Sequence, residues 1–164
     1  MEEMTEKEML HRAAAYCSSA ERCIQEVEKK IADAGLSPEA SERIISHLVK
    51  EKFIDESRFS QSFVNDKLRF NKWGRVKIGY ELRKKNIPSS CYSDALESIN
   101  EEEYHSILLS LLKAKKKSTR GKDERDIFYK LLRFAAGRGF ESNEAIRCLR
   151  ELGNTDEDYA EIME

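Results

Sequence analysis

Apolar residues recur at three- and four-residue spacing along most of the chain, which is the period of amphipathic helices. After Thr5 they fall on one helical face, and Thr5 with Glu8 has the T-x-x-E spacing of a capping box. Ser37, Asp55 and Asn100 each stand before another stretch of this kind and are residue types that cap helices. The pattern predicts an all-α protein.

One stretch departs from this period, because Val76 to Leu82 alternates apolar and polar residues as a strand would. When Gly35, Asn86 and Gly139 are set in register, at intervals of 51 and 53 residues, apolar positions coincide eight and four residues before them and one residue after. Gly and Asn are typical of left-handed helix C-caps. Any helical chain rich in Leu and Ile gives some accidental matches between apolar positions. Here, however, the helix-capping residue, the Gly or Asn that ends a helix and the helix that follows it recur together in the same order. The stretch is therefore predicted to be helical.

The same register predicts three copies of one helical unit of about 50 residues. The predicted units are residues 1–53, 54–100 and 101–153, each of three helices. Since such units bury their helices against neighbouring units, we expect an elongated, curved array. Residues 154–164 carry five acidic residues and no basic one, and we expect a frayed, weakly ordered acidic C-terminal tail.

The composition and the cysteine spacing indicate the compartment of the protein. The 29 Lys and Arg nearly balance the 31 Asp and Glu, so the net charge is −2, and mean hydropathy is −0.68. No apolar run approaches the roughly 18 residues that a bilayer span needs, and the N-terminus is acidic, unlike a signal peptide. The four cysteines form no C-x-x-C pair. We expect a cytoplasmic protein with free, mostly buried thiols and no membrane association.

Motifs for catalysis or metal binding are missing from the sequence. It has no glycine-rich phosphate loop, no nucleophile elbow and no H-E-x-x-H. His11, His47 and His105 lack metal-ligand spacing. We therefore predict no enzyme, no metal and no cofactor.

The charges are unevenly distributed. Between Lys67 and Lys85 lie eight basic residues and one acidic residue, a net charge of +7. Between Lys113 and Arg125 lie seven basic and two acidic residues, a net charge of +5, and this second run is predicted to be a flexible linker. The near-neutral total therefore hides two strongly basic segments.

Aromatic residues interleave the first basic run, at Phe70, Trp73 and Tyr80. Cations that offset phosphates and rings that stack on bases are what single-stranded nucleic acid requires. An acidic protein partner would suit the same surface. Alternatively, Trp73 and Tyr80 are buried core residues and the lysines form an ordinary solvent-exposed face. The sequence leaves these interpretations open.

Two segments of this region resemble a known family. Residues 53–59 read F-I-D-E-S-R-F and residues 77–87 read K-I-G-Y-E-L-R-K-K-N-I. They are similar to the L-I-D-D-x-R-F and R-I-x-x-E-L-x-x-K-G-I patterns of the RecX family of bacterial regulators of the RecA recombinase. Trp73-Gly74 fills the aromatic-glycine position between them, and residues 133–140 resemble the R-F-x-x-x-R-G-[FY] pattern. Lys67 and Lys77 stand where the family commonly has arginine, and Asn86 stands where it has glycine.

The resemblance implies a regulator that lies along the groove of the RecA filament and inhibits ATP hydrolysis and strand exchange, in recombination, DNA repair and the SOS response. We expect a monomer, and our hypothesis is that its basic face contacts the RecA filament and single-stranded DNA. The expected binding residues are Lys67, Arg69, Lys72, Trp73, Arg75, Lys77, Lys84, Lys85, Arg133 and Arg138.

Two other functions fit the residues without the resemblance. A three-helix unit with a break before a basic helix can mimic a helix-turn-helix, which would make the chain a DNA-binding regulator. A non-catalytic helical adaptor that binds only proteins is the other alternative. The salt dependence of binding to random single strands separates direct phosphate contact from protein recognition.

Overall fold

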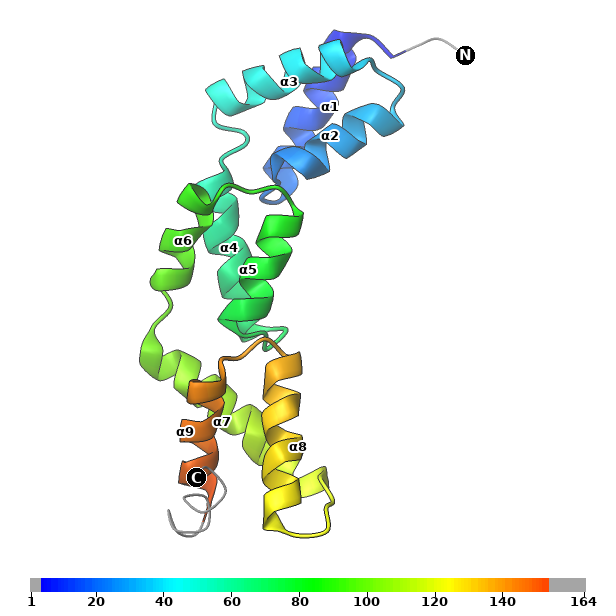
Figure 1. Cartoon of the computed structure of the whole chain (residues 1–164). Helices are drawn as coiled ribbons and strands as arrows, with labels where there is room; N and C mark the ends of the chain where they lie inside the picture. The colour runs from blue at the N-terminus through cyan, green and yellow to red at the C-terminus, as the bar shows by residue number, and fades with distance from the viewer. Residues whose placement is uncertain (1–3, 154–164) are drawn as a thin grey trace. The chain divides into compact units, whose positions relative to one another are not determined.

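The structure is a computed structural model, and it describes residues 4–153 (Figure 1). Within that range the secondary structure is entirely helical, which confirms the all-α prediction. The helices are α1 (Glu6–Ser19), α2 (Ile24–Asp33), α3 (Pro38–Lys50), α4 (Glu56–Arg69), α5 (Arg75–Lys84), α6 (Ser89–Glu97), α7 (Glu101–Ser118), α8 (Glu124–Gly137) and α9 (Ser142–Leu152). None of these helices is long and apolar enough to cross a membrane. The predicted acidic tail, residues 154–164, lies outside the described residues.

The helices begin at the cap residues that the sequence indicated. Thr5 Oγ1 accepts a hydrogen bond of 3.1 Å from the Glu8 amide, and the Glu8 carboxylate accepts one of 3.4 Å from the Thr5 amide, which completes the capping box of α1. Ser37 caps α3 and Asn100 caps α7 in the same way, through side-chain oxygens that accept from backbone amides. Each cap satisfies an amide that the first helical turn would leave without a partner.

The predicted C-terminal signals are also confirmed. Gly35, Asn86 and Gly139 have φ values of +88°, +61° and +90°, the left-handed conformation that ends a helix. The stretch from Val76 to Leu82 lies within α5 and is helical, as the internal comparison predicted. Its alternating pattern misleads because α5 is amphipathic only in part, with Val76 exposed at one end and Leu82 fully buried at the other.

The chain divides into two compact units. The first consists of Met1–Phe63 with Leu82–Ala95, and the second consists of Val64–Glu81 with Leu96–Glu164. The predicted boundaries of three repeats and their elongated, curved arrangement stay predictions.

The first unit has a core built by the first three helices. Helices α1, α2 and α3 pack against one another. Their buried side chains follow the expected helical spacing and are Met9, Ala13, Cys17, Val27, Ile31, Ile44 and Leu48, with Ile54 from the segment that follows. Burial of this apolar surface stabilises the unit.

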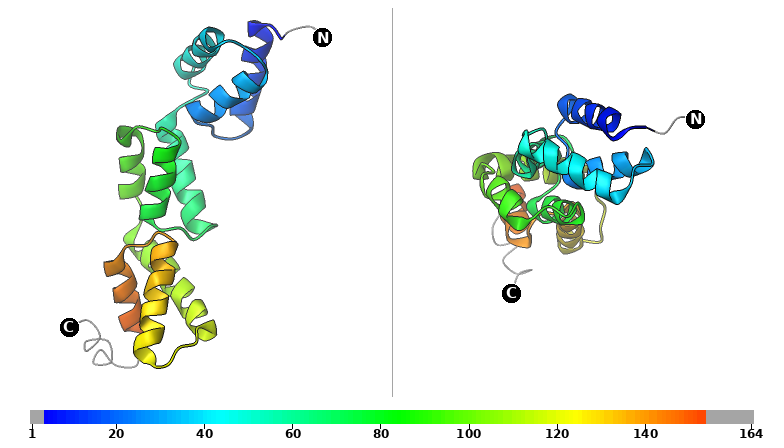
Figure 2. Two further views of the ribbon diagram at one scale, coloured as in Figure 1. Left: turned by 45° about the vertical axis from the view of Figure 1, so that its right-hand side comes forward. Right: turned by 90° about the horizontal axis from the view of Figure 1, so that it is seen from above.

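The second unit is centred on α7, α8 and α9, which pack pairwise and lie together in the left view of Figure 2. The buried residues of these helices include Tyr104, Leu108, Leu112, Phe128, Leu131, Cys148 and Leu149. Residues 64–81, which contain most of the first basic run, belong to the same unit. The unit therefore contains both basic segments that the sequence revealed, apart from Lys84, Lys85 and Arg83.

The second basic run is not the linker that was predicted. Helix α7 continues to Ser118, so Lys113, Lys115, Lys116 and Lys117 lie on a helix, and α8 begins at Glu124. Lysine is a good helix former, and cations in the last turn interact favourably with the helix dipole. The run of lysines therefore does not interrupt α7.

All four cysteines are free thiols, as expected from their spacing. Cys17, Cys23 and Cys148 are buried and Cys91 is half-buried. Burial raises the pKa of Cys23 to about 11 and that of Cys148 to about 12. These two thiols are therefore protonated and unreactive at neutral pH.

Candidate functional site

The Trp73-Gly74 segment lies directly against the turn between α8 and α9. The Gly74 amide donates a hydrogen bond of 2.8 Å to the Arg138 carbonyl, and the Val76 amide donates one of 2.9 Å to the Gly139 carbonyl. A Cβ atom on Gly74 would lie 2.4 Å from the Gly139 carbonyl oxygen, and one on Gly139 would lie 2.2 Å from Lys77 Cβ. Both positions need glycine because two backbones meet there.

The Arg138 side chain reinforces this contact. Its Nε donates to the Lys72 carbonyl at 3.3 Å, and its Nη2 donates to the Asn71 carbonyl. The guanidinium thus satisfies carbonyls of the loop between α4 and α5. Two sequence motifs that lie more than 60 residues apart, the aromatic-glycine pair and R-G-F at 138–140, therefore form one structural junction.

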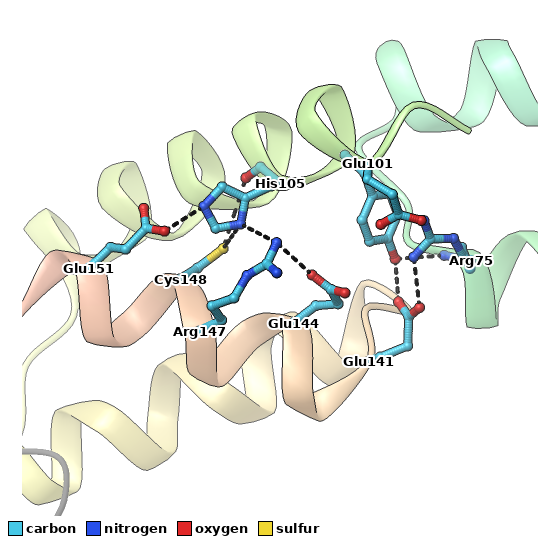
Figure 3. Close-up of polar contacts among 9 residues, drawn as sticks. Arg75, Glu101, His105, Glu141, Glu144, Arg147, Cys148 and Glu151 are labelled. Carbon is cyan, nitrogen blue, oxygen red and sulfur yellow. Dashed lines mark hydrogen bonds and ion pairs between the residues drawn. The ribbon is translucent and has the colours of Figure 1, made fainter. Parts of the chain in front are cut away.

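Arg75, the first residue of α5, is held by carboxylates. Its Nη1 lies 2.9 Å from Glu141 Oε2 and its Nη2 lies 2.6 Å from Glu101 Oε1 (Figure 3). Its guanidinium carbon lies 3.9 Å from the centre of the Tyr104 ring, and the side chain is only 20% exposed. The charge of Arg75 is therefore largely neutralised within the second unit.

Tyr104 and Glu141 complete this cluster. The Tyr104 hydroxyl donates to Glu141 Oε1 and accepts a hydrogen bond of 3.1 Å from the Arg75 amide. Burial and the Glu141 carboxylate raise the pKa of Tyr104, so the hydroxyl stays protonated and can donate. Burial alone would raise the pKa of Glu141, but the hydrogen bond from Tyr104 and the Arg75 ion pair outweigh it and lower that pKa. The cluster stabilises a carboxylate and a guanidinium together.

Arg69 forms a second ion pair, nearer to the surface. Its Nε lies 2.7 Å from Glu103 Oε1, and both side chains are more than a third exposed. The hydrogen bond from Arg69 lowers the pKa of Glu103. Three arginines of the predicted binding set, Arg69, Arg75 and Arg138, thus bind groups of the protein itself.

The lysines of the set are arranged differently, around Trp73. Lys67 Nζ lies 5.0 Å and Lys77 Nζ 4.5 Å from the centre of the Trp73 ring system. Lys72 Nζ donates to the Arg69 carbonyl at 2.6 Å. Such cation–π contacts hold the two ammonium groups beside an aromatic face.

Exposed aromatic residues lie in the same stretch of the second unit. Phe70 is 79% exposed and Tyr80 is 53% exposed, whereas Trp73 is half-buried. Tyr80 is therefore not the core anchor that one interpretation of the sequence allowed. Residues 67–80 combine ammonium groups with accessible rings.

The other predicted residues lie elsewhere. Lys84 and Lys85 belong to the first unit, where Lys85 Nζ lies 3.9 Å from Glu26 Oε2 and near the rings of Phe59 and Phe63. Arg133 is exposed on α8. The structure thus brings together Lys67, Arg69, Lys72, Trp73, Arg75, Lys77 and Arg138 in the second unit.

A polar cluster between α7 and α9 was not anticipated from the sequence. His105 Nε2 lies 2.8 Å from Glu151 Oε1, and His105 Nδ1 lies 3.2 Å from Arg147 Nη2 and 3.5 Å from Cys148 Sγ (Figure 3). This pairing of histidine with cysteine joins residues 43 apart in sequence, so no local motif reveals it. Because its pKa is raised to about 12, the Cys148 thiol is not an activated nucleophile. Within residues 4–153 no group of three or more His, Cys, Asp or Glu residues could hold a metal ion.

Comparison with known proteins places these features in a family. Residues 55–96 match the family model of the second three-helix domain of RecX. The regulatory protein RecX of Prosthecochloris aestuarii is 30% identical over 153 residues, which cover 93% of this chain and 98% of that protein. That of Pelodictyon phaeoclathratiforme is 34% identical over 129 residues, which cover 77% of this chain and 78% of that protein.

Other relatives are longer than this chain. The regulatory protein RecX of Lactobacillus johnsonii is 26% identical over 156 residues, and the match covers 94% of this chain but 58% of that protein. The crystal structure of RecX from Lactobacillus salivarius superposes with a TM-score of 0.78 at 21% identity, over 90% of this chain and 96% of that one, and shows the same fold. With two regulatory proteins matched at 30% identity or more over most of their length, the chain belongs to the RecX family.

Proposed function

We propose that this protein binds the RecA recombinase filament in the cytoplasm, as a monomer, and inhibits its ATPase and strand-exchange activities during recombination, DNA repair and the SOS response. Membership in a family of regulatory proteins supports a regulatory role. The chain acts by binding and has no catalytic function in this proposal, in keeping with the protonated Cys148 thiol beside His105.

The contacts with the filament and its DNA are assigned to the lysines around Trp73. Lys67, Lys72 and Lys77 can approach phosphates while their ammonium groups remain charged, and the nearby Phe70 ring is accessible for stacking. Lys84 and Lys85 of the first unit, and Arg133, are further candidate contacts. The arrangement of two ammonium groups beside Trp73 is the observation that carries this assignment.

Arg69, Arg75 and Arg138 have a positioning role in this proposal. Each donates to a carboxylate or to backbone carbonyls, and a phosphate could recruit it only by breaking those bonds. Arg75 and Arg138 hold the start of α5 and the preceding loop, so that Trp73 and its lysines occupy defined positions, whereas Arg69 joins the end of α4 to Glu103 on α7. Substituting Arg75 or Arg138 affects binding through the fold and not through lost contacts.

A RecA strand-exchange assay tests the assignment. We expect the Lys67→Gln, Lys77→Gln double variant to need at least about ten times more protein for half-inhibition, because lost phosphate contacts weaken binding. The matched control changes Lys7 and Lys50, two exposed lysines of the first unit, to Gln and should inhibit as the wild type does. Unchanged inhibition by the double variant, with an unchanged helical CD spectrum, would refute the assignment.

The salt dependence of binding to random single strands tests direct phosphate contact. The logarithm of the binding constant falls with the logarithm of salt concentration by about 0.7 for each phosphate contact to single strands. We expect the double variant to lose about 1.4 from the slope. A wild-type slope near zero would contradict DNA contact and would leave recognition of RecA protein alone.

A further inference from the structure

We propose that the acidic residues 154–164 dock onto a cationic surface at the C-terminal end of α7 and the loop that follows. This α7–α8 cationic surface consists of Lys113, Lys117, Arg120, Lys122 and Arg125, all exposed residues of the second unit. The docking itself does not depend on the function proposed above. It follows from the charge, position and reach of the two segments.

The positive charge of this surface is only partly compensated locally, by Asp126 near Lys122. Among residues 4–153, no carboxylate forms an ion pair with the side chains of Lys113, Lys117, Arg120, Lys122 or Arg125. The neighbouring acids serve other groups: Asp123 accepts from the Asp126 amide as the cap of α8, and Asp126 accepts from the Lys122 amide and pairs with Lys130. A cluster of exposed cations without such partners attracts an acidic segment.

The end of α9 lies beside the last turn of α7. Helix α9 ends at Leu152, and the Leu152 carbonyl accepts a hydrogen bond of 3.4 Å from Lys116 Nζ on α7. Lys116 directly precedes Lys117 in the last turn of α7. The chain therefore leaves α9 beside the last turn of α7, which also carries Lys117.

The length of the segment is sufficient. Eleven residues span up to about 35 Å when extended, whereas the 18 residues of α7 span about 27 Å. Every cation of the surface is thus within reach of residues 154–164. Because the segment is tethered, its effective concentration at the surface is in the millimolar range, so that weak ion pairs suffice for occupancy.

The occupant is defined by its charge. Residues 154–164 contain five carboxylates and no basic side chain, and these carboxylates belong to Asp156, Glu157, Asp158, Glu161 and Glu164. A nucleic acid or an acidic protein that uses the same cations has to displace them. This consequence, self-inhibition of ligand binding, rests on the proposed function, whereas the docking does not.

Neutralising the segment in the full chain tests the docking. The neutral-tail variant carries Asp156→Asn, Glu157→Gln, Asp158→Asn, Glu161→Gln and Glu164→Gln. The matched control changes five exposed carboxylates at other positions and has the same net charge, through Glu28→Gln, Glu42→Gln, Glu51→Gln, Asp94→Asn and Glu97→Gln. At low salt we expect NMR amide shifts of Lys113, Lys117 and Arg120 to change in the neutral-tail variant and not in the control. Unchanged shifts in the neutral-tail variant would overturn the docking.

A peptide gives an independent measurement. A fluorescein-labelled peptide of residues 154–164 should bind the neutral-tail variant at least about tenfold more tightly than the wild type, whose own segment occupies the surface. Adding Lys113→Gln, Lys117→Gln and Arg120→Gln should abolish that binding. Equal affinity for the wild type and the neutral-tail variant would contradict the proposal.

Binding of single-stranded DNA separates the two proposals. If the neutral-tail variant binds DNA more tightly than the charge-matched control, the acidic segment competes with the ligand. If neither protein binds DNA, the proposed phosphate contacts are wrong, and the peptide measurement still decides whether the segment docks.

Discussion

The two basic segments of the second unit are similar in sequence and differ in how their charge is used. In residues 67–77 the arginines bind carboxylates of α7 and of Glu141, the residue before α9, and Arg75 alone pairs with Glu101 and Glu141. In residues 113–125 every cation except the half-buried Lys116 is exposed and, among the described residues, the side chains of Lys113 and Lys117 form no ion pair. A high density of positive charge in a sequence therefore does not show how much of that charge is available to a partner.

The difference follows the chemistry of the side chains. The planar guanidinium of Arg75 binds two carboxylates while stacking on Tyr104, a geometry that an ammonium group cannot reproduce. The ammonium groups of Lys67 and Lys77 lie beside the Trp73 ring instead. Carboxylates of the protein bind the arginines of the first segment, whereas the second segment exposes both lysines and arginines.

The largest expected effect comes from the junction that positions the first segment. Gly139→Ala should lower the free energy of unfolding by about 3 kcal/mol or more, because φ is +90° and the new Cβ would overlap Lys77. Gly35→Ala, with φ of +88° and nothing within 4 Å, is the control and should cost only about 1–2 kcal/mol. Urea unfolding measures both. Equal losses would show that the contact between backbones adds nothing to the conformational cost.

The next largest effect distinguishes the ion pair of Arg75 from that of Arg69. Arg75→Gln should cost about 2 kcal/mol, since it leaves the half-buried Glu141 without its cation. Arg69→Gln should leave stability unchanged within error, because the pair with Glu103 is exposed to solvent. Thermal and urea unfolding report both values. A comparable loss for Arg69→Gln would remove the distinction between structural and surface pairs.

The pH dependence sharpens the same point. Because the pKa of Glu141 is lowered from 4.5, its contribution to stability is fully present above pH 4.5 and is lost as pH falls through the lower folded-state value. Glu141→Gln should therefore be less stable than the wild type at neutral pH and should lose less stability on acidification. Unfolding free energies measured from neutral pH to about pH 3 check this. Parallel curves for the two proteins would mean that Glu141 does not titrate differently in the folded state.

The smallest effect is expected in the second segment. Lys113→Gln with Lys117→Gln should change the free energy of unfolding by no more than about 0.5 kcal/mol, because both side chains are exposed and unpaired among the described residues. The same unfolding measurements apply. A loss as large as that of Arg75→Gln would show that these lysines also hold structure.

Local features were predictable from the sequence. The capping box at Thr5 and the left-handed residues Gly35, Asn86 and Gly139 depend on neighbours within four residues, so spacing and residue type were enough. The helical character of residues 76–82 followed from comparison with equivalent positions. The predicted binding residues were chosen mainly for their positive charge, because a local segment of sequence shows the charge of a side chain and not its partner in the fold.

Features that depend on distant pairing were not predictable. Arg75 meets Glu141 across 66 residues, and His105 meets Cys148 across 43, and neither partner carries a local signal of the other. The end of α7 was misplaced for a different reason. A run of lysines was interpreted as a linker, although the apolar face of α7 continues to the buried Leu112 and lysine itself favours helix.

The junction between α5 and the α8–α9 turn also determines how anions can approach. The first amides of a helix can form a binding site for phosphate when they have no other acceptor. At α5, the Gly74 and Val76 amides already donate to the Arg138 and Gly139 carbonyls, and the Arg75 amide donates to the Tyr104 hydroxyl. The strongly basic stretch of this protein therefore lacks the backbone cradle of a phosphate-binding loop. It can attract a polyanion along its length through side chains, but it is poorly suited to grip a single phosphate group.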